Sequence, residues 1–135
     1  MVNLQLRYLS FFFGLVSVLS FFNIIYSYYL NLYLNLNTYY YSFFVSLIVS
    51  ILFYKINLFK LKLSIFDKIL TIFFGYIFIP LILSIPFYFS IYNLTFLNSY
   101  FEAISGFTST GFSIFENIKH IDQSLILWRS STQWL

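Results

Sequence analysis

The sequence has 135 residues, of which 61% are hydrophobic, 26% aromatic and only 8% charged. A soluble domain cannot cover its surface with so few charged groups, so we expect a protein embedded in a lipid bilayer. The net charge of +3 is too small to indicate a nucleic-acid-binding surface. The absence of cysteine and the single histidine leave little material for a metal cluster and none for a disulfide within this sequence.

Two membrane spans are predicted first, because no charged residue occurs between Arg7 and Lys55. A hydrocarbon core about 30 Å thick needs about 20 residues of helix. We expect one span at residues 9–30 and a shorter one at 39–54, separated by an asparagine-rich turn that is typical of a helix break. Residues 1–54 then form a transmembrane hairpin. A cleaved signal peptide is disfavoured, since the apolar run continues without a small-residue cleavage site.

Positive charge gathers in the next segment, residues 55–68, which contains a single acid, Asp67. Its four lysines are Lys55, Lys60, Lys62 and Lys68. The positive-inside rule makes this basic loop cytoplasmic. It also places the N-terminus in the cytoplasm and the asparagine-rich turn outside.

A third span is predicted at residues 69–92. It contains Gly75, Pro80 and Pro86, residue types that membrane helices tolerate. We expect Pro86 to mark a kink or the outer end of this span.

The stretch that follows has the chemistry of a segment that enters the bilayer and turns back. Ser99 and Glu102 form an S-x-x-E capping box. This predicts a pore helix at residues 99–107, about 15 Å long at about 1.5 Å per residue, which is half a membrane. On these local features alone, a surface helix followed by a turn is the alternative.

The four residues after this helix are Thr108, Ser109, Thr110 and Gly111. Small hydroxyl side chains allow close approach, and glycine can adopt backbone angles that turn successive carbonyls toward one axis. Such carbonyls can replace the hydration water of an ion. The helix C-terminus, which carries partial negative charge, favours a cation at the same point. We therefore expect a cation filter at Thr108, Ser109, Thr110 and Gly111.

Two stretches of sequence resemble the first pore unit of the TrkH and KtrB potassium transporters, most closely TrkH. They are YFEAISGFTSTGFSIF at residues 100–115 and SLILWRSSTQWL at residues 124–135. Subunits of this family repeat a helix, pore loop, helix unit four times, and TrkH-type members carry an extra hairpin before the first unit. Ser109 stands where threonine is frequent in the family.

The resemblance implies several properties. Potassium would be the transported ion, held by the carbonyls of residues 108–111, and no organic cofactor would be needed. Partners would be the remaining pore units of a full-length subunit, a second copy in a homodimer and a cytoplasmic nucleotide-binding regulatory subunit. The location would be the inner cell membrane, with the pore loop entering from outside.

Three further polar residues receive interpretations from their context. Glu102 is interpreted as a cap that steadies the pore helix. Arg129 is either a family feature at the outer start of the next helix or an interfacial anchor beside Trp128 and Trp134. His120 is interpreted as a solvated residue of the outer loop.

The predicted fold class is an all-α integral membrane protein. Residues 69–135 form the first pore unit, with an outer loop at 112–123 and the start of the next helix at 124–135. One filter segment is a quarter of a closed ring of carbonyls, so we expect a fragment of a transporter subunit, truncated at the start of that helix. Two alternatives are a small membrane subunit and a truncated product without transport of its own.

An enzyme is disfavoured on the sequence. The only candidate acids and bases near the predicted outer face are Glu102, Glu116, His120 and Asp122. They show no recognisable catalytic spacing. We therefore expect no enzymatic activity.

Overall fold

The computed structural model describes residues 6–56, 64–115 and 121–135, and these ranges contain helices and turns but no strand. In chain order the helices are α1 (Leu6–Tyr29), α2 (Leu36–Ile56), α3 (Ile65–Leu83), α4 (Ile85–Tyr88), α5 (Phe96–Phe107) and α6 (Gln123–Thr132). Within these ranges, three stretches are long and apolar enough to cross a membrane, namely α1, α2 and the pair α3–α4 at Ile65–Tyr88. The predicted class of an all-α membrane protein is confirmed.

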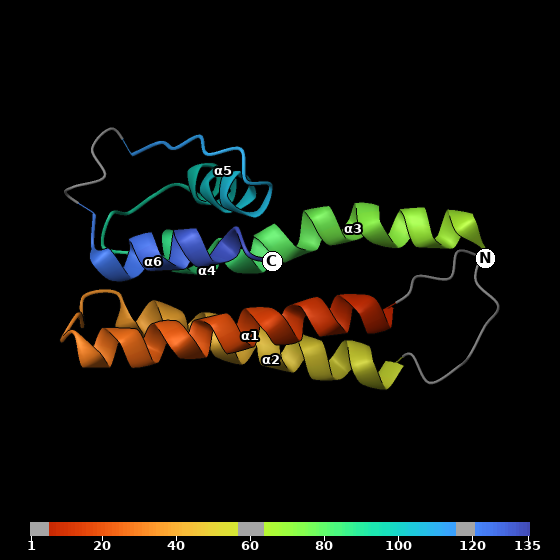
Figure 1. Ribbon diagram of the computed structural model, residues 1–135, viewed down its shortest axis with the longest axis horizontal. Coiled ribbons are helices and arrows are strands. Elements are labelled where there is room, and N and C mark those ends of the chain that lie inside the picture. Colours follow the sequence, from red (N-terminus) through yellow and green to blue (C-terminus); the bar gives the residue numbers. More distant parts are fainter. Residues whose placement is uncertain (1–5, 57–63, 116–120) are drawn as a thin grey trace.

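Helices α1 and α2 lie side by side and antiparallel (Figure 1), and small polar residues line their contact. Ser10 Oγ donates to the Ser50 carbonyl at 2.8 Å, and Ser50 Oγ donates to the Ser10 carbonyl at 2.8 Å. Farther along, Ser20 Oγ donates to Ser42 Oγ at 3.1 Å. Small residues let two helices approach closely in lipid, where hydroxyl groups find partners across the contact. This contact holds the hairpin together.

The second helix is longer than the sequence predicted. It begins at Leu36 rather than Tyr39 and continues to Ile56. Thr38 Oγ1 donates to the Asn35 carbonyl at 2.7 Å, so the polar residues of the turn contribute to the first turn of α2. Asn31 adopts a left-handed φ of 57°, a conformation that asparagine tolerates, and it ends the first helix as expected.

Helix α3 begins four residues earlier than predicted. Ser64 and Asp67 form a capping box, in which Phe66 N donates to Ser64 Oγ and Ser64 N donates to Asp67 Oδ2. The expectation that all of residues 55–68 form a loop is therefore wrong, because Lys55 lies in α2 and Lys68 in α3. Lys60 and Lys62 lie outside the described residues.

The predicted third span, 69–92, is divided into two helices and ends at Tyr88. The break lies at Ser84, two residues before Pro86. Pro86 has no N–H for the Ile82 carbonyl, so one hydrogen bond of a continuous helix is missing here, whereas Pro80 lies inside α3 without ending it. Of the two roles predicted for Pro86, a kink or the outer end of the span, the structure shows a break in the helix next to it, at Ser84. From α6, Trp128 Nε1 donates to the Leu83 carbonyl at the break, at 3.1 Å.

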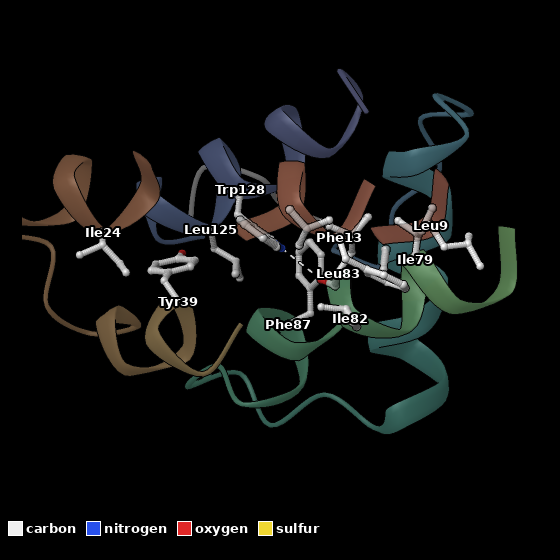
Figure 2. Packing of buried hydrophobic residues seen from close by; sticks show 12 residues of the cluster. Leu9, Phe13, Ile24, Tyr39, Ile79, Ile82, Leu83, Phe87, Leu125 and Trp128 are labelled. Carbon is white, nitrogen blue, oxygen red and sulfur yellow. Dashed lines mark hydrogen bonds between the residues drawn. The ribbon is translucent and has the colours of Figure 1, made fainter. Parts of the chain in front are cut away.

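The apolar core lies between the hairpin and the later helices (Figure 2). Trp128 of α6 is fully buried against Tyr39 of α2, with ring centroids 6.0 Å apart. The labelled core residues come from α1, α2, α3, α4 and α6 and are Leu9, Phe13, Ile24, Tyr39, Ile79, Ile82, Leu83, Phe87, Leu125 and Trp128. Helix α6 is thus packed against both the hairpin and the α3–α4 break.

Candidate functional site

The chain makes an excursion through α5 that starts and ends at the same end of the molecule. Asn35, in the turn between α1 and α2, accepts a hydrogen bond from Ile91 N at 3.1 Å and donates to Asp122 Oδ2 at 2.7 Å. Tyr92 OH also accepts from Asp122 N at 2.7 Å. The residues just before α5 and just before α6 therefore meet at one point. In Figure 1 the α1–α2 turn and the start of α6 lie together at the left end, with α5 farther in.

Helix α5 begins earlier than predicted, with Thr95 as its N-cap. Thr95 Oγ1 accepts from Asn98 N at 3.3 Å, and the helix runs from Phe96 to Phe107. Ser99 lies inside the helix, where its hydroxyl donates to the Thr95 carbonyl at 3.0 Å. The predicted capping box of Ser99 and Glu102 is therefore wrong, whereas the predicted end at Phe107 agrees. Its 12 residues span about 18 Å.

The backbone after α5 turns sharply with its amide groups pointing back at the helix. Thr108 N donates to the Ile104 carbonyl at 2.8 Å, and Ser109 N donates to the Gly106 carbonyl at 3.0 Å. Thr110 N donates to a helix carbonyl as well, at 3.1 Å. Two residues of this stretch have positive φ: 54° at Ser109 and 80° at Gly111. The sequence indicated the special backbone conformation at the glycine but not at the serine.

One face of α5 holds the returning chain. Glu102 Oε1 accepts from Ser113 Oγ at 2.8 Å and from Ile114 N at 2.5 Å. One turn later, Ser105 Oγ donates to the Phe112 carbonyl. Side chains three residues apart project from the same face of a helix, so the two contacts fasten the stretch after the filter residues along α5. Sequence reasoning missed Ser105 and Ser113, although the spacing of Glu102 and Ser105 was a usable signal.

Arg129 of α6 reaches the same stretch from the other side. Its Nε lies 3.3 Å from Glu102 Oε2, and its Nη2 donates to the Phe112 carbonyl at 2.7 Å and to the Gly111 carbonyl at 3.3 Å. The Glu102 side chain is 0% exposed and that of Arg129 is 16% exposed. The alternative of Arg129 as an interfacial anchor is therefore not supported, because its guanidinium is directed into the protein. Of the two neighbouring tryptophans, only Trp134 is exposed.

Helices α5 and α6 approach each other at Gly106. A methyl group there would collide with the hydroxyl of Thr132, and the Arg129 carbonyl would lie 3.5 Å from it. Only glycine allows this approach without rearrangement. The contact fixes the distance between α5 and the part of α6 that carries Arg129.

The start of α6 is anchored by polar contacts to the hairpin. Asp122 is the N-cap, and its Oδ1 accepts from Ser124 N at 3.2 Å. Ser124 Oγ donates to Asp122 Oδ2 at 2.9 Å and accepts from Tyr39 OH at 2.9 Å. The helix begins at Gln123, one residue before the predicted start. Glu116 and His120, in the predicted outer loop, lie outside the described residues.

The chemistry that this site offers is that of backbone oxygens. Among the described residues, no three His, Cys, Asp or Glu side chains come together to hold a metal ion. Residues 108–112 are exposed, and a groove of about 210 Å³ runs beside Gly111 and Arg129. Backbone carbonyls of this exposed stretch can contact a cation or another protein segment.

Part of this chain is similar to a known protein. No model of a known protein family matches the sequence. A stretch of 52 residues is 33% identical to part of an uncharacterised cation transporter from Methanocaldococcus jannaschii. The match covers 38% of this chain and 11% of that relative. The chain is thus similar to a small part of a much longer protein.

Proposed function

We propose that this chain is part of a membrane protein that transports monovalent cations, chiefly potassium. Residues 108–111 would supply one segment of a filter of backbone carbonyls. The observation that carries the proposal is the excursion of α5 and the stretch after it, which leave one end of the helical bundle and return to it. In a membrane, such a path is tolerated only where other protein covers the irregular backbone or where it lines a water-filled path.

The hydrogen bonding of residues 108–110 supports this reading. Their amide groups are bound to α5 carbonyls, as described above. No described residue donates a hydrogen bond to the carbonyl oxygens of Thr108, Ser109 or Thr110. Residues 108–110 are exposed in this chain, so these carbonyls can accept a partner from outside it. A dehydrated cation would satisfy them, and the negative end of the α5 dipole would favour its charge.

A closed ring of carbonyls needs further segments around the same axis. The relative from Methanocaldococcus jannaschii is named a cation transporter, and the resemblance to TrkH implies four pore units in one subunit. We infer that this chain works together with such units. A homodimer, a cytoplasmic nucleotide-binding regulatory subunit, an inner-membrane location and a cytoplasmic N-terminus belong to the same proposal.

The test is cation uptake by the full protein that the gene encodes. In a cell deficient in potassium uptake, we expect the wild type to restore growth at low potassium and to take up rubidium. Gly111 has a φ of 80°, and a Cβ there would meet nothing within 4 Å, so a substitution acts through the backbone rather than through crowding. Asparagine tolerates this conformation and a β-branched residue does not.

Gly111→Val should therefore abolish rubidium uptake, while Gly111→Asn retains a measurable part of it. Gly14→Ala, in the α1–α2 contact, is the control and should keep wild-type uptake. If Gly111→Val transported rubidium as well as the wild type at equal membrane abundance, the filter assignment would be wrong.

A further inference from the structure

The structure assigns Arg129 as a positioning residue that limits which carbonyls of the filter segment can bind a cation. We propose that its guanidinium occupies the carbonyl oxygens of Gly111 and Phe112. The cation ligands of this segment are then restricted to the carbonyls of residues 108–110. This inference rests on the proposed transport function and refines the predicted filter, in which Gly111 was also a ligand.

The geometry separates two groups of carbonyls. Arg129 Nη2 lies 2.7 Å from the Phe112 carbonyl oxygen and 3.3 Å from that of Gly111. A carbonyl oxygen has two lone pairs, but the positive guanidinium beside it opposes the approach of a second cation. The carbonyls of residues 108–110 have no such neighbour among the described residues. The carbonyls of residues 108–110 can therefore bind a cation, whereas those of Gly111 and Phe112 accept from Arg129 instead.

The carboxylate of Glu102 compensates for the positive charge of Arg129 next to the filter segment. Its Oε2 lies 3.3 Å from Arg129 Nε, while its Oε1 accepts from Ser113 Oγ and Ile114 N. A positive charge without this partner would repel cations from the adjacent ligands. The carboxylate thus lets Arg129 hold two carbonyls without opposing transport.

Three contacts determine where Arg129 lies, so its position does not depend on the ion pair alone. Trp128, the preceding residue, is fully buried and bonded to the Leu83 carbonyl. Thr132 Oγ1 donates to the Arg129 carbonyl at 2.7 Å and packs against Gly106. Substituting the Arg129 side chain should therefore leave the path of α6 in place.

The experiment measures rubidium uptake and its inhibition by sodium, using the full protein in intact cells at matched membrane abundance. The variants are Glu102→Gln, Arg129→Gln and the double variant. Glutamine at position 102 keeps the shape and the acceptor oxygen of the side chain but removes its charge. Arg7→Gln is the matched control, because Arg7 lies exposed in the first turn of α1, over the Tyr54 ring at 6.0 Å.

Each variant has its own expected result. Glu102→Gln leaves an uncompensated positive charge, so its KM for rubidium should rise about tenfold while its preference for rubidium over sodium persists. Arg129→Gln releases the two carbonyls, so its preference for rubidium over sodium should fall about tenfold. The double variant restores neutrality, so its KM should return to within about threefold of the wild type while the preference stays low.

Arg129→Lys distinguishes the fork of the guanidinium from its charge. A lysine is a point charge and cannot reach both carbonyls and the carboxylate together. The preference of Arg129→Lys for rubidium over sodium should fall as in Arg129→Gln, with little change in its KM for rubidium. Arg129→Lys also tests the inference if Arg129→Gln does not reach the membrane.

Unchanged rubidium preference in both Arg129 variants, with uptake intact, would overturn this inference and leave the transport function standing. So would an unchanged KM in Glu102→Gln. A wild-type protein without any rubidium uptake would instead overturn the proposed function, and this inference with it.

Discussion

The contact between α5 and α6 at Gly106 gives a sharp prediction for stability. In Gly106→Ala, the new methyl group would overlap the Thr132 hydroxyl, which is bonded to the Arg129 carbonyl at 2.7 Å. Relief requires rotating the hydroxyl away and losing its bond, or moving the two helices apart. Either change acts directly on the part of α6 that carries the guanidinium.

The magnitude follows from three terms. Overpacking costs about 1–3 kcal/mol, and a lost hydrogen bond costs about 1 kcal/mol. Replacing glycine by alanine inside a helix raises the free energy of unfolding by up to about 1 kcal/mol. We expect Gly106→Ala to lower the free energy of unfolding by about 1–3 kcal/mol. In the double variant with Thr132→Ala, the methyl group would lie 3.5 Å from Thr132 Cβ and from the Arg129 carbonyl, an ordinary contact.

The assay is a double-mutant cycle on the purified full protein, followed by unfolding in lipid–detergent micelles. The two substitutions should be non-additive by about 1–2 kcal/mol, with the double variant more stable than Gly106→Ala alone. Gly14→Ala is the control, because its methyl group would lie 3.4 Å from Ser50 Oγ and needs little adjustment. The close approach would be refuted if Gly106→Ala were as stable as Gly14→Ala, or if the two effects simply added.

Three other substitutions test the contacts that hold the excursion in place. Trp128→Phe removes the bond to the Leu83 carbonyl and should cost about 1 kcal/mol beyond the lost area, seen as a lower midpoint of thermal unfolding; an unchanged midpoint would contradict the capping of the α3–α4 break. Asn35→Ala leaves its partners on both sides of α5 without their bonds and should cost about 2 kcal/mol, measured in the same way; a neutral result would mean that the two chain segments meet for other reasons. Ser20→Ala, which removes one bond to Ser42, should cost only about 0.6 kcal/mol, and a loss several times larger would show that the hairpin depends on single hydroxyl contacts.

Hydropathy and backbone chemistry were sufficient for the scaffold. The absence of charge between Arg7 and Lys55 predicts the two helices of the hairpin, because an uncharged apolar stretch of this length is enough for two crossings of the hydrocarbon core. Pro86 predicts the break because the missing N–H is a local property. The end of α5 at Phe107 was predicted for the same kind of reason, since small residues and glycine follow it.

The site depended on contacts that local patterns do not encode. Thr95 and Ser99 are both plausible N-caps, and Ser99 has a glutamate three residues later, as a capping box requires. The structure uses Thr95 because Glu102 contacts the returning chain and Arg129 instead. Such a choice is made by the tertiary fold, so the sequence pattern alone selected the wrong cap. The capping box that the structure does contain, Ser64 with Asp67, lies in a segment whose lysines led to the prediction of a loop.

Cysteine accessibility tests most directly on which side of the membrane each end of this chain lies. The chain has no cysteine, so Thr110→Cys would introduce a single thiol into it, at an exposed position of the filter segment. Lys55→Cys would place a single thiol in the last turn of α2, at the end of that helix away from the α1–α2 turn. We expect a membrane-impermeant thiol reagent to modify Thr110→Cys only from outside the cell, and rubidium or potassium to slow that reaction more than sodium does. Lys55→Cys should react only from the cytoplasmic side. Modification of Thr110→Cys from the cytoplasmic side, or at a rate that no cation changes, would contradict a carbonyl filter that enters the bilayer from outside.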